Sequence, residues 1–240
     1  MRRAVHTEQR VALDDGAQTT LERWGDGDRR VLCIHGMTGS RKAWEDFAAA
    51  YGDRARIYAY DQRGHGDSAA VSGPMTLHRS LLDLYNVLGA IGEPVDTLIG
   101  HSWGGAIAIL GGRRFDVKRV VAIDPMLHQG NTAWYDRFLR ELKKDRAMRS
   151  AIKRLRDENP PQSWNLREDL EQYPKPLFLA VGEGAESLLT LEDLKFVRDR
   201  GGSQVALRVF EGHGHSPQRT DPERFIRELN VFFERTGAAP

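Results

Sequence analysis

Short apolar runs alternate with longer amphipathic segments along this chain of 240 residues. The short runs are rich in β-branched residues, which is typical of buried strands. They predict strands at residues 5–13, 19–24, 30–34, 56–60, 97–99, 118–123, 177–181 and 205–210. The longer segments predict helices at residues 42–51, 77–91, 103–115, 191–200 and 222–235. This alternation indicates an α/β protein with a mostly parallel sheet.

Local signals refine several of these elements. The turn sequence DDGA separates the first two strands, so we expect them to pair as an antiparallel hairpin at one edge of the sheet. Thr190 and Asp221 stand directly before two predicted helices and are typical N-cap residues. An apolar helix face that covers the sheet is predicted from residues at helical spacing, namely Leu77, Leu81, Leu84, Leu88 and Ile91.

The segment from about residue 126 to residue 175 interrupts this rhythm. Its apolar residues form a stripe on an otherwise charged sequence, at Phe138, Leu142, Met148, Ile152 and Leu155. The stripe predicts a small helical insertion over the sheet. Nine basic and two acidic residues lie between Arg137 and Arg156. That run could recognise an anionic substrate or an acidic partner, although such runs more often form a solvated face.

Composition and charge narrow the class of protein. A chain of 240 residues, 40% of them hydrophobic, is expected to form a single domain over residues 1–240 with the insertion included. A net charge of +1 does not predict binding to nucleic acid or to an anionic membrane surface. The sequence has no apolar run of membrane-spanning length and its N-terminus has no apolar core of a signal peptide, so a soluble, cytoplasmic protein is expected. The oligomeric state stays open.

The single cysteine is Cys33, in the apolar run VLCI. One cysteine cannot form an intramolecular disulfide or, alone, a thiolate metal cage. Its neighbours predict a buried, inert thiol.

The stretch GHSWGG is the first candidate for chemistry. Ser102 lies between Gly100 and Gly104 at the spacing G-x-S-x-G, after a predicted strand and before a predicted helix. A tight turn there would expose the serine hydroxyl, and small residues on either side avoid a clash. The N–H of Trp103 would lie at the helix N-terminus and could stabilise an oxyanion.

Three further stretches, VLCIHGMTGS, YAYDQRGHGDS and FEGHGHS, accompany this motif, and together they resemble the α/β-hydrolase family. The resemblance implies an eight-stranded, mostly parallel sheet flanked by helices, with a cap inserted after the sixth strand that selects the substrate. It implies that the backbone N–H of Met37 is the second oxyanion donor and that His215 is the general base. It also implies that the loop containing His65 is structural. A simple glycine turn at Gly36 is the alternative reading of the first of these stretches.

Two metal-site readings compete with these roles. One pairs His65 with Asp67, and the other pairs His213 with His215, which could also be ordinary loop histidines. No second cluster at ligand spacing supports either pair, and the chain order of serine, acid and histidine favours a triad.

The acid of the triad is left open by the sequence. The family usually places it three residues past a glycine after the seventh strand, where this chain has Ala185. Asp124, which ends the preceding strand, is the favoured candidate, followed by Glu186 and then Glu183. An Asp-Pro pair that simply starts a turn is the alternative reading of Asp124.

These residues predict a serine hydrolase that cleaves a small carboxylic ester, lactone or thioester through an acyl-enzyme, without a cofactor or metal. The dehalogenase and epoxide-hydrolase branches of the family carry aspartate at the nucleophile position, so the serine at position 102 argues against them. Carbon–carbon bond hydrolysis, elimination or amide cleavage with the same residues is the alternative, and a non-catalytic small-molecule receptor is a third reading. Trp134, Tyr135 and Trp164 could line an acyl pocket or anchor the cap.

Overall fold

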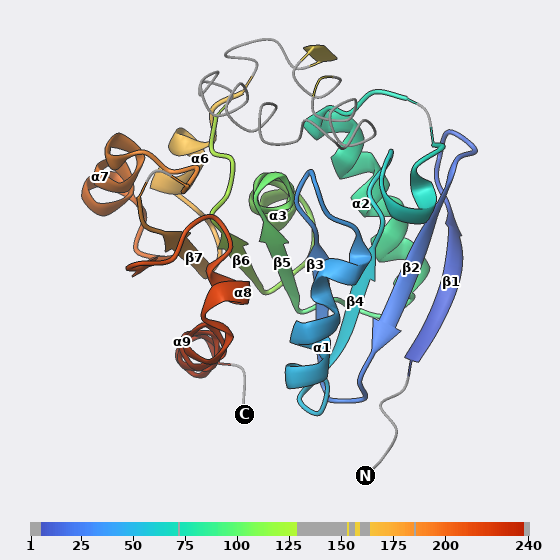
Figure 1. Ribbon diagram of the computed structural model, residues 1–240, viewed down its shortest axis with the longest axis horizontal. Helices are drawn as coiled ribbons and strands as arrows, with labels where there is room; N and C mark the ends of the chain where they lie inside the picture. The colour runs from blue at the N-terminus through green and yellow to red at the C-terminus, as the bar shows by residue number, and fades with distance from the viewer. Residues whose placement is uncertain are drawn as a thin grey trace.

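Eight strands form one sheet in the computed structural model, which describes residues 6–71, 73–128, 153, 157–158, 164–184 and 186–237. The strand order is β1-β2-β4-β3-β5-β6-β7-β8 (Figure 1). The bounds are β1 His6–Ala12, β2 Gln18–Trp24, β3 Arg29–Ile34, β4 Ala55–Tyr60, β5 Thr97–His101, β6 Arg119–Ile123, β7 Leu177–Gly182 and β8 Val205–Phe210. The pairings from β4 to β8 are parallel, whereas β1 and β2 form the predicted antiparallel hairpin at one edge.

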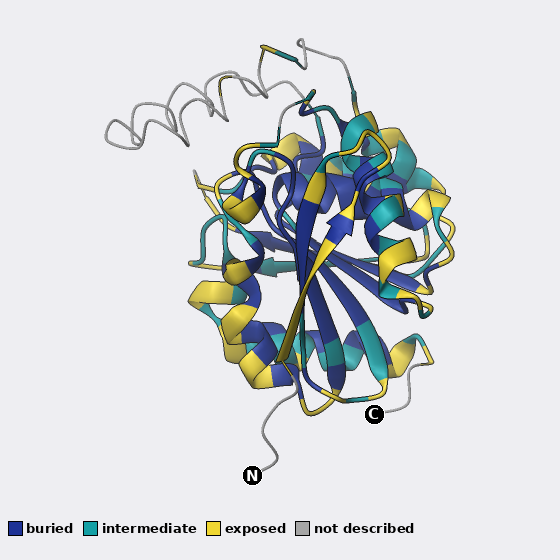
Figure 2. Ribbon diagram, turned by 90° about the vertical axis from the view of Figure 1, so that its right-hand side faces the viewer, coloured by how far each residue is buried: buried dark blue, intermediate teal, exposed yellow. Residues whose placement is uncertain are grey.

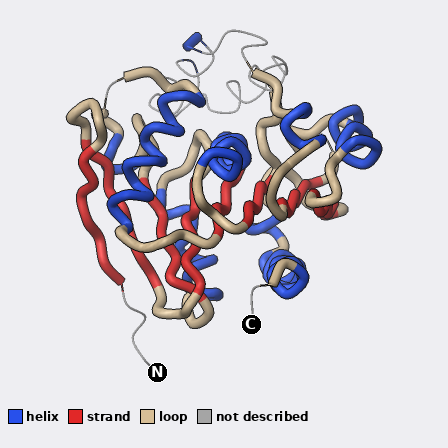
Figure 3. Tube along the Cα trace, turned by 180° about the vertical axis from the view of Figure 1, so that it is seen from behind, coloured by secondary structure: helices blue, strands red, loops and turns tan. Residues whose placement is uncertain are grey.

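Helices cover both faces of this sheet, as the opposite views in Figures 1 and 3 show. They are α1 Glu45–Tyr51, α2 Leu77–Ile91, α3 Trp103–Arg114, α6 Arg167–Glu171, α7 Leu191–Arg200, α8 Pro217–Thr220 and α9 Pro222–Arg235, with 3-10 turns at Arg41–Trp44 and Gly66–Ser68. Buried residues of α2, α3 and α7 pack on one face, and those of α1 and α9 pack on the other.

The two faces explain why the central strands are apolar throughout. In β6, Val120 and Ala122 belong to one core cluster while Val121 and Ile123 belong to the other. Figure 2 shows these central strands as buried, with the edge strand β1 largely exposed in front of them. Cys33 is fully buried, as predicted, and burial raises the pKa of its thiol.

Most predicted elements are confirmed to within two residues at each end. Thr190 accepts a hydrogen bond from Asp193 N, and Asp221 accepts one from Arg224 N, so both predicted N-caps are present. The helix predicted at residues 42–51 begins as a 3-10 turn, and the short helices α6 and α8 were not predicted. Most of the predicted insertion, including its apolar stripe, lies outside the described residues. No helix within the described residues is long and apolar enough to cross a membrane.

Candidate active site

The turn between β5 and α3 holds Ser102 in a strained conformation. Its φ of 58° and ψ of −119° lie where non-glycine residues are rare. A backbone hydrogen bond to β6 holds it there, since Ser102 N donates to Ile123 O at 2.9 Å. A Cβ on Gly100 would lie 2.0 Å from Gly104 O, and one on Gly104 would lie 2.3 Å from Ile34 O. Both flanking glycines are therefore required by close backbone approach.

Asp124 follows β6 directly and is fully buried. His215 Nδ1 donates to its Oδ2 at 2.6 Å, which leaves Nε2 of a neutral imidazole ring without a proton. Two more groups donate hydrogen bonds to the carboxylate of Asp124. Ser187 Oγ donates to Oδ1 at 2.6 Å and Leu188 N donates to Oδ2 at 2.8 Å. The structure thus brings His215 together with Asp124.

The other two candidate carboxylates lie elsewhere on the same loops. The Glu186 side chain packs against the backbone of Gly214, where an added Cβ would lie 2.3 Å from its Oε2. Glu183 Oε2 accepts a hydrogen bond from Gly212 N at 3.0 Å. Among the described hydrogen bonds, neither carboxylate contacts His215. The loop between β7 and α7 therefore supplies donors to Asp124 through Ser187, a residue that no sequence signal identified.

His101, next to Ser102, contacts the loop that carries His215. Its Nε2 donates to the backbone carbonyl of His215 at 2.8 Å, and the two ring centroids are 4.6 Å apart. Burial, together with the neighbouring His215, lowers the pKa of His101 to about 3. The ring is therefore neutral at physiological pH and its Nε2 carries the proton.

The loop after β3 approaches Ser102 closely. A Cβ on Gly36 would lie 3.0 Å from the Ser102 Cβ. The carbonyl of Gly36 accepts hydrogen bonds from His35 Nδ1 at 2.7 Å and from Gly39 N at 3.0 Å. In a trans peptide the N–H points opposite to the carbonyl, so these bonds fix the direction of the Met37 N–H. Trp103, whose N–H is the other predicted donor, is the first residue of α3.

Histidines and Gln62 hold this loop in place. His35 Nε2 accepts a hydrogen bond from Gln62 N at 3.0 Å, and burial lowers the pKa of His35 to about 3. His65 Nε2 lies 2.5 Å from Met37 O, and its Nδ1 lies 2.9 Å from Arg63 O. Both nitrogens of His65 thus contact backbone carbonyls.

In the described part of the chain, the two histidines of the second hypothetical metal site contact different partners. His213 Nδ1 contacts Thr220 Oγ1 at 2.9 Å, whereas His215 faces Asp124. No group of three or more His, Cys, Asp or Glu residues among those described is placed to hold a metal ion.

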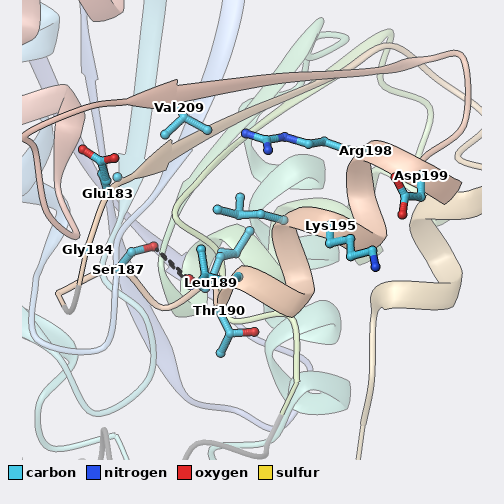
Figure 4. A pocket seen from close by; sticks show the side chains of 12 residues that line it. Glu183, Gly184, Ser187, Leu189, Thr190, Lys195, Arg198, Asp199 and Val209 are labelled. Carbon is cyan, nitrogen blue, oxygen red and sulfur yellow. Dashed lines mark hydrogen bonds between the residues drawn. The ribbon is translucent and has the colours of Figure 1, made fainter.

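Ser102 and His215 line one cavity of about 240 Å³ at the carboxyl ends of the strands. This cleft also includes Met37, Trp44 and His101. A second cavity of about 740 Å³ lies between β7, β8 and α7, and Ser187 forms part of its wall. Figure 4 shows Ser187 hydrogen-bonded to Leu189 there, and Arg198 reaching from α7 toward Val209.

Trp164, a described residue of the predicted insertion, lies near the turn that carries Ser102. Its ring meets that of Trp103 edge to face, with centroids 6.0 Å apart. Trp164 lies within the predicted insertion of residues 126–175, so this aromatic contact joins the insertion to the first residue of α3. Trp134 and Tyr135 lie outside the described residues.

Comparison with known proteins agrees with this architecture. Residues 31–228 match the profile of the Alpha/beta hydrolase family. An abhydrolase domain-containing protein of Schizosaccharomyces pombe is 33% identical over 110 residues, which are 44% of this chain and 38% of that protein. Lipase LipV of Mycobacterium tuberculosis is 33% identical over 108 residues, 44% of this chain and 41% of the lipase. The matches therefore span well under half of either relative.

A solved structure gives a similar fold over more of the chain. It is that of a membrane phospholipase A, described as a bacterial virulence factor, with a TM-score of 0.80 and 19% identity, covering 98% of this chain and 87% of the other. At that identity the likeness concerns the fold alone. The family match covers most of the sequence, and the chain therefore belongs to the alpha/beta hydrolase family.

Proposed function

We propose that the protein is a serine hydrolase of the carboxylesterase type, which cleaves a small carboxylic ester, lactone or thioester. The observation that carries this proposal is the hydrogen bond of 2.6 Å between His215 Nδ1 and the buried Asp124, at a cleft that Ser102 also lines. A buried carboxylate that fixes the histidine tautomer is what a general base for serine requires.

The proposed reaction proceeds in two halves. His215 Nε2 takes the proton of Ser102 Oγ as that oxygen attacks the carbonyl carbon of the substrate. The tetrahedral oxyanion is stabilised by the N–H groups of Met37 and Trp103. The imidazolium, stabilised by Asp124, then protonates the leaving group. Water activated by the same histidine hydrolyses the acyl-enzyme.

The same proposal includes a cap. Residues 126–175 follow β6 and precede β7, and within one domain over residues 1–240 they would form a helical cap that selects a small-molecule substrate. The Trp103–Trp164 contact supports a cap whose end rests beside the nucleophile.

Covalent labelling tests the nucleophile. A fluorophosphonate probe should label the protein stoichiometrically, and Ser102→Ala should abolish the label, as read by intact-protein mass spectrometry. Ser216→Ala is the matched control, because Ser216 lines the same cleft and should leave the label in place. A label that survives in Ser102→Ala would overturn the proposal.

Turnover tests the bond that is cleaved. A series of 4-nitrophenyl esters of increasing acyl length should be hydrolysed by the parent and not by Ser102→Ala. Specific labelling of Ser102 without turnover of any ester would contradict ester cleavage and would direct the same residues to a carbon–carbon or amide bond.

A further inference from the structure

Among the described residues that line the cleft beside Ser102, one carries a permanent positive charge and none is a carboxylate. The polar wall of the cleft is formed by Thr38, Ser216, Gln218 and Arg219. Arg219 belongs to the short helix α8, which follows the loop that carries His215. It makes no ion pair with any of the residues that the structure describes.

The other charged groups near the cleft do not offset Arg219. Asp124 is fully buried, is not among the lining residues of the cleft, and accepts three hydrogen bonds that solvate its carboxylate. His35 and His101 are neutral, because burial lowers the pKa of each to about 3. Among the described lining residues, the guanidinium of Arg219 is therefore the one permanent charge.

Two buried polar atoms of the same lining lack a partner among the described residues. They are Nε1 of Trp44, a residue that is 2% exposed, and Oε1 of Gln218. Buried polar groups are nearly always hydrogen-bonded, so the unpaired indole N–H needs an acceptor and the unpaired amide oxygen needs a donor. Of the two atoms, the indole N–H can donate to an anion, whereas the amide oxygen only accepts.

We propose that the cleft binds substrates carrying a carboxylate a few atoms from the reacting carbonyl, and that Arg219 is the residue that selects them, with Trp44 as a neutral donor. This inference rests on the proposed function. Arginine and carboxylate form paired, planar hydrogen bonds. One cation balances one negative charge, so a monoanionic carboxylate fits this wall better than a dianionic phosphate. A cleft of about 240 Å³ favours a short substrate, such as the half-ester of a short dicarboxylic acid.

A matched substrate pair tests the selection. Monomethyl glutarate and dimethyl glutarate share the reacting ester and differ in the far carboxylate, and hydrolysis of both can be followed by acid release in a pH-stat. The parent should have the higher kcat/KM for the monoanion. Arg219→Ala should lower that kcat/KM about 10- to 100-fold, which is the effect expected from the loss of a hydrogen bond between charged groups. The same variant should change kcat/KM for the diester less than about 3-fold. Arg219→Lys should recover part of the loss, because it keeps the charge.

Arg198→Ala is the control for charge removal in general. Arg198 is an exposed arginine without an ion pair among the described residues, and it lines the second cavity rather than the cleft (Figure 4). This variant should keep the parent's preference for the monoanion. An equal preference in Arg219→Ala and the parent, or no preference in the parent, would overturn the inference.

Protection from labelling separates this inference from the proposed function. Glutarate should slow fluorophosphonate labelling of Ser102 in the parent and not in Arg219→Ala, whereas inorganic phosphate at the same ionic strength should protect neither protein. Normal labelling with no protection by glutarate contradicts carboxylate binding and leaves the nucleophile intact. Protection of Ser102 by phosphate but not by glutarate would contradict carboxylate binding and would indicate a phosphorylated substrate instead. No labelling at all contradicts the proposed function itself.

Discussion

At the scale of single residues, Asp124 combines full burial, a φ of 38° and three hydrogen-bond donors. Aspartate tolerates the left-handed region better than most residues, because its short polar side chain can bond locally. Here the side chain bonds to His215, Ser187 and Leu188, which come from two other loops. The backbone strain at Asp124 therefore aims its carboxylate between those loops.

Separate neutralisation of Asp124 and Glu186 tests which carboxylate assists His215. Asp124→Asn should lower kcat/KM for a neutral ester by about 10⁴, because the amide cannot stabilise the imidazolium and disturbs the tautomer. Glu186→Gln should change it less than about 3-fold, since Glu186 packs against Gly214 instead. Initial rates, with circular dichroism to verify folding, provide the measurement. A larger loss in Glu186→Gln than in Asp124→Asn would assign the role to the glutamate.

The sequence identifies some of these residues better than others. Ser102 and His215 stand in short motifs whose strand and helix context can be recognised from hydrophobic patterning. The choice between Asp124 and Glu186 depends on which loop reaches His215 in space, and residue spacing along the chain does not contain that distance. Ser187 has no motif at all, because its role comes from a hydrogen bond of 2.6 Å to a residue 63 positions earlier in the chain.

At the scale of elements, several hydrogen bonds fix the half of the β7–α7 loop that leads into α7. Ser187 and Leu188 donate to Asp124, and Thr190 begins α7 with a capping box formed with Asp193. Asp193 also contacts Arg167 Nε at 2.6 Å, which joins α7 to α6. Two residues of this loop thus donate hydrogen bonds to the carboxylate that follows the neighbouring strand β6.

Removal of the Ser187 hydroxyl tests that support. Ser187→Ala should lower kcat about 5- to 30-fold with little change in KM, because one oxygen of Asp124 loses its donor while the substrate cleft is unchanged. Ser187→Thr should restore part of kcat, since it keeps a hydroxyl. Steady-state kinetics on one neutral ester would measure both parameters.

Thr190→Ala is the matched control for this loop. It removes the cap hydroxyl and should lower the free energy of unfolding by about 1 kcal/mol, while kcat stays within about 2-fold of the parent. Equal losses of kcat in the two alanine variants would mean that Ser187 acts only through loop stability.

Helices were predicted where their apolar faces or caps are long enough to leave a pattern. The bounds of α2, α7 and α9 match the prediction because each spans ten or more residues with a recognisable cap or stripe. The helices α6 and α8 have five and four residues, which is too short for helical periodicity to show.

At the scale of the whole molecule, the sheet divides the apolar residues into two core clusters and gathers the site loops at one end of the parallel strands. Ser102, Asp124 and the loop of His215 follow β5, β6 and β8 respectively. Ligand sites of open α/β sheets lie at that end. The alternation of strands and helices predicts this layered fold. The strand order that brings β3 between β4 and β5 depends instead on contacts between residues that are far apart in the sequence.

Two neutral histidines in this interior make stability dependent on pH. Burial lowers the pKa of both His35 and His101 to about 3, against about 6.5 in the unfolded chain. The unfolded state then binds more protons than the folded state at every pH between these values. Their contribution is complete above about pH 7 and is lost as the pH falls from about 6.5 toward 3.

Urea unfolding of the parent and His101→Gln at pH 7.0, 6.0 and 5.0 measures this contribution. Between pH 7 and pH 5 one such histidine should remove about 2 kcal/mol from the free energy of unfolding, so the variant should lose about that much less than the parent. Ordinary carboxylates titrate mostly below this window. His78→Gln, at an exposed position on α2, should keep the parent's slope. The same slope in His101→Gln and the parent would show that His101 takes up its proton in the folded protein, which would remove the neutral donor beneath His215.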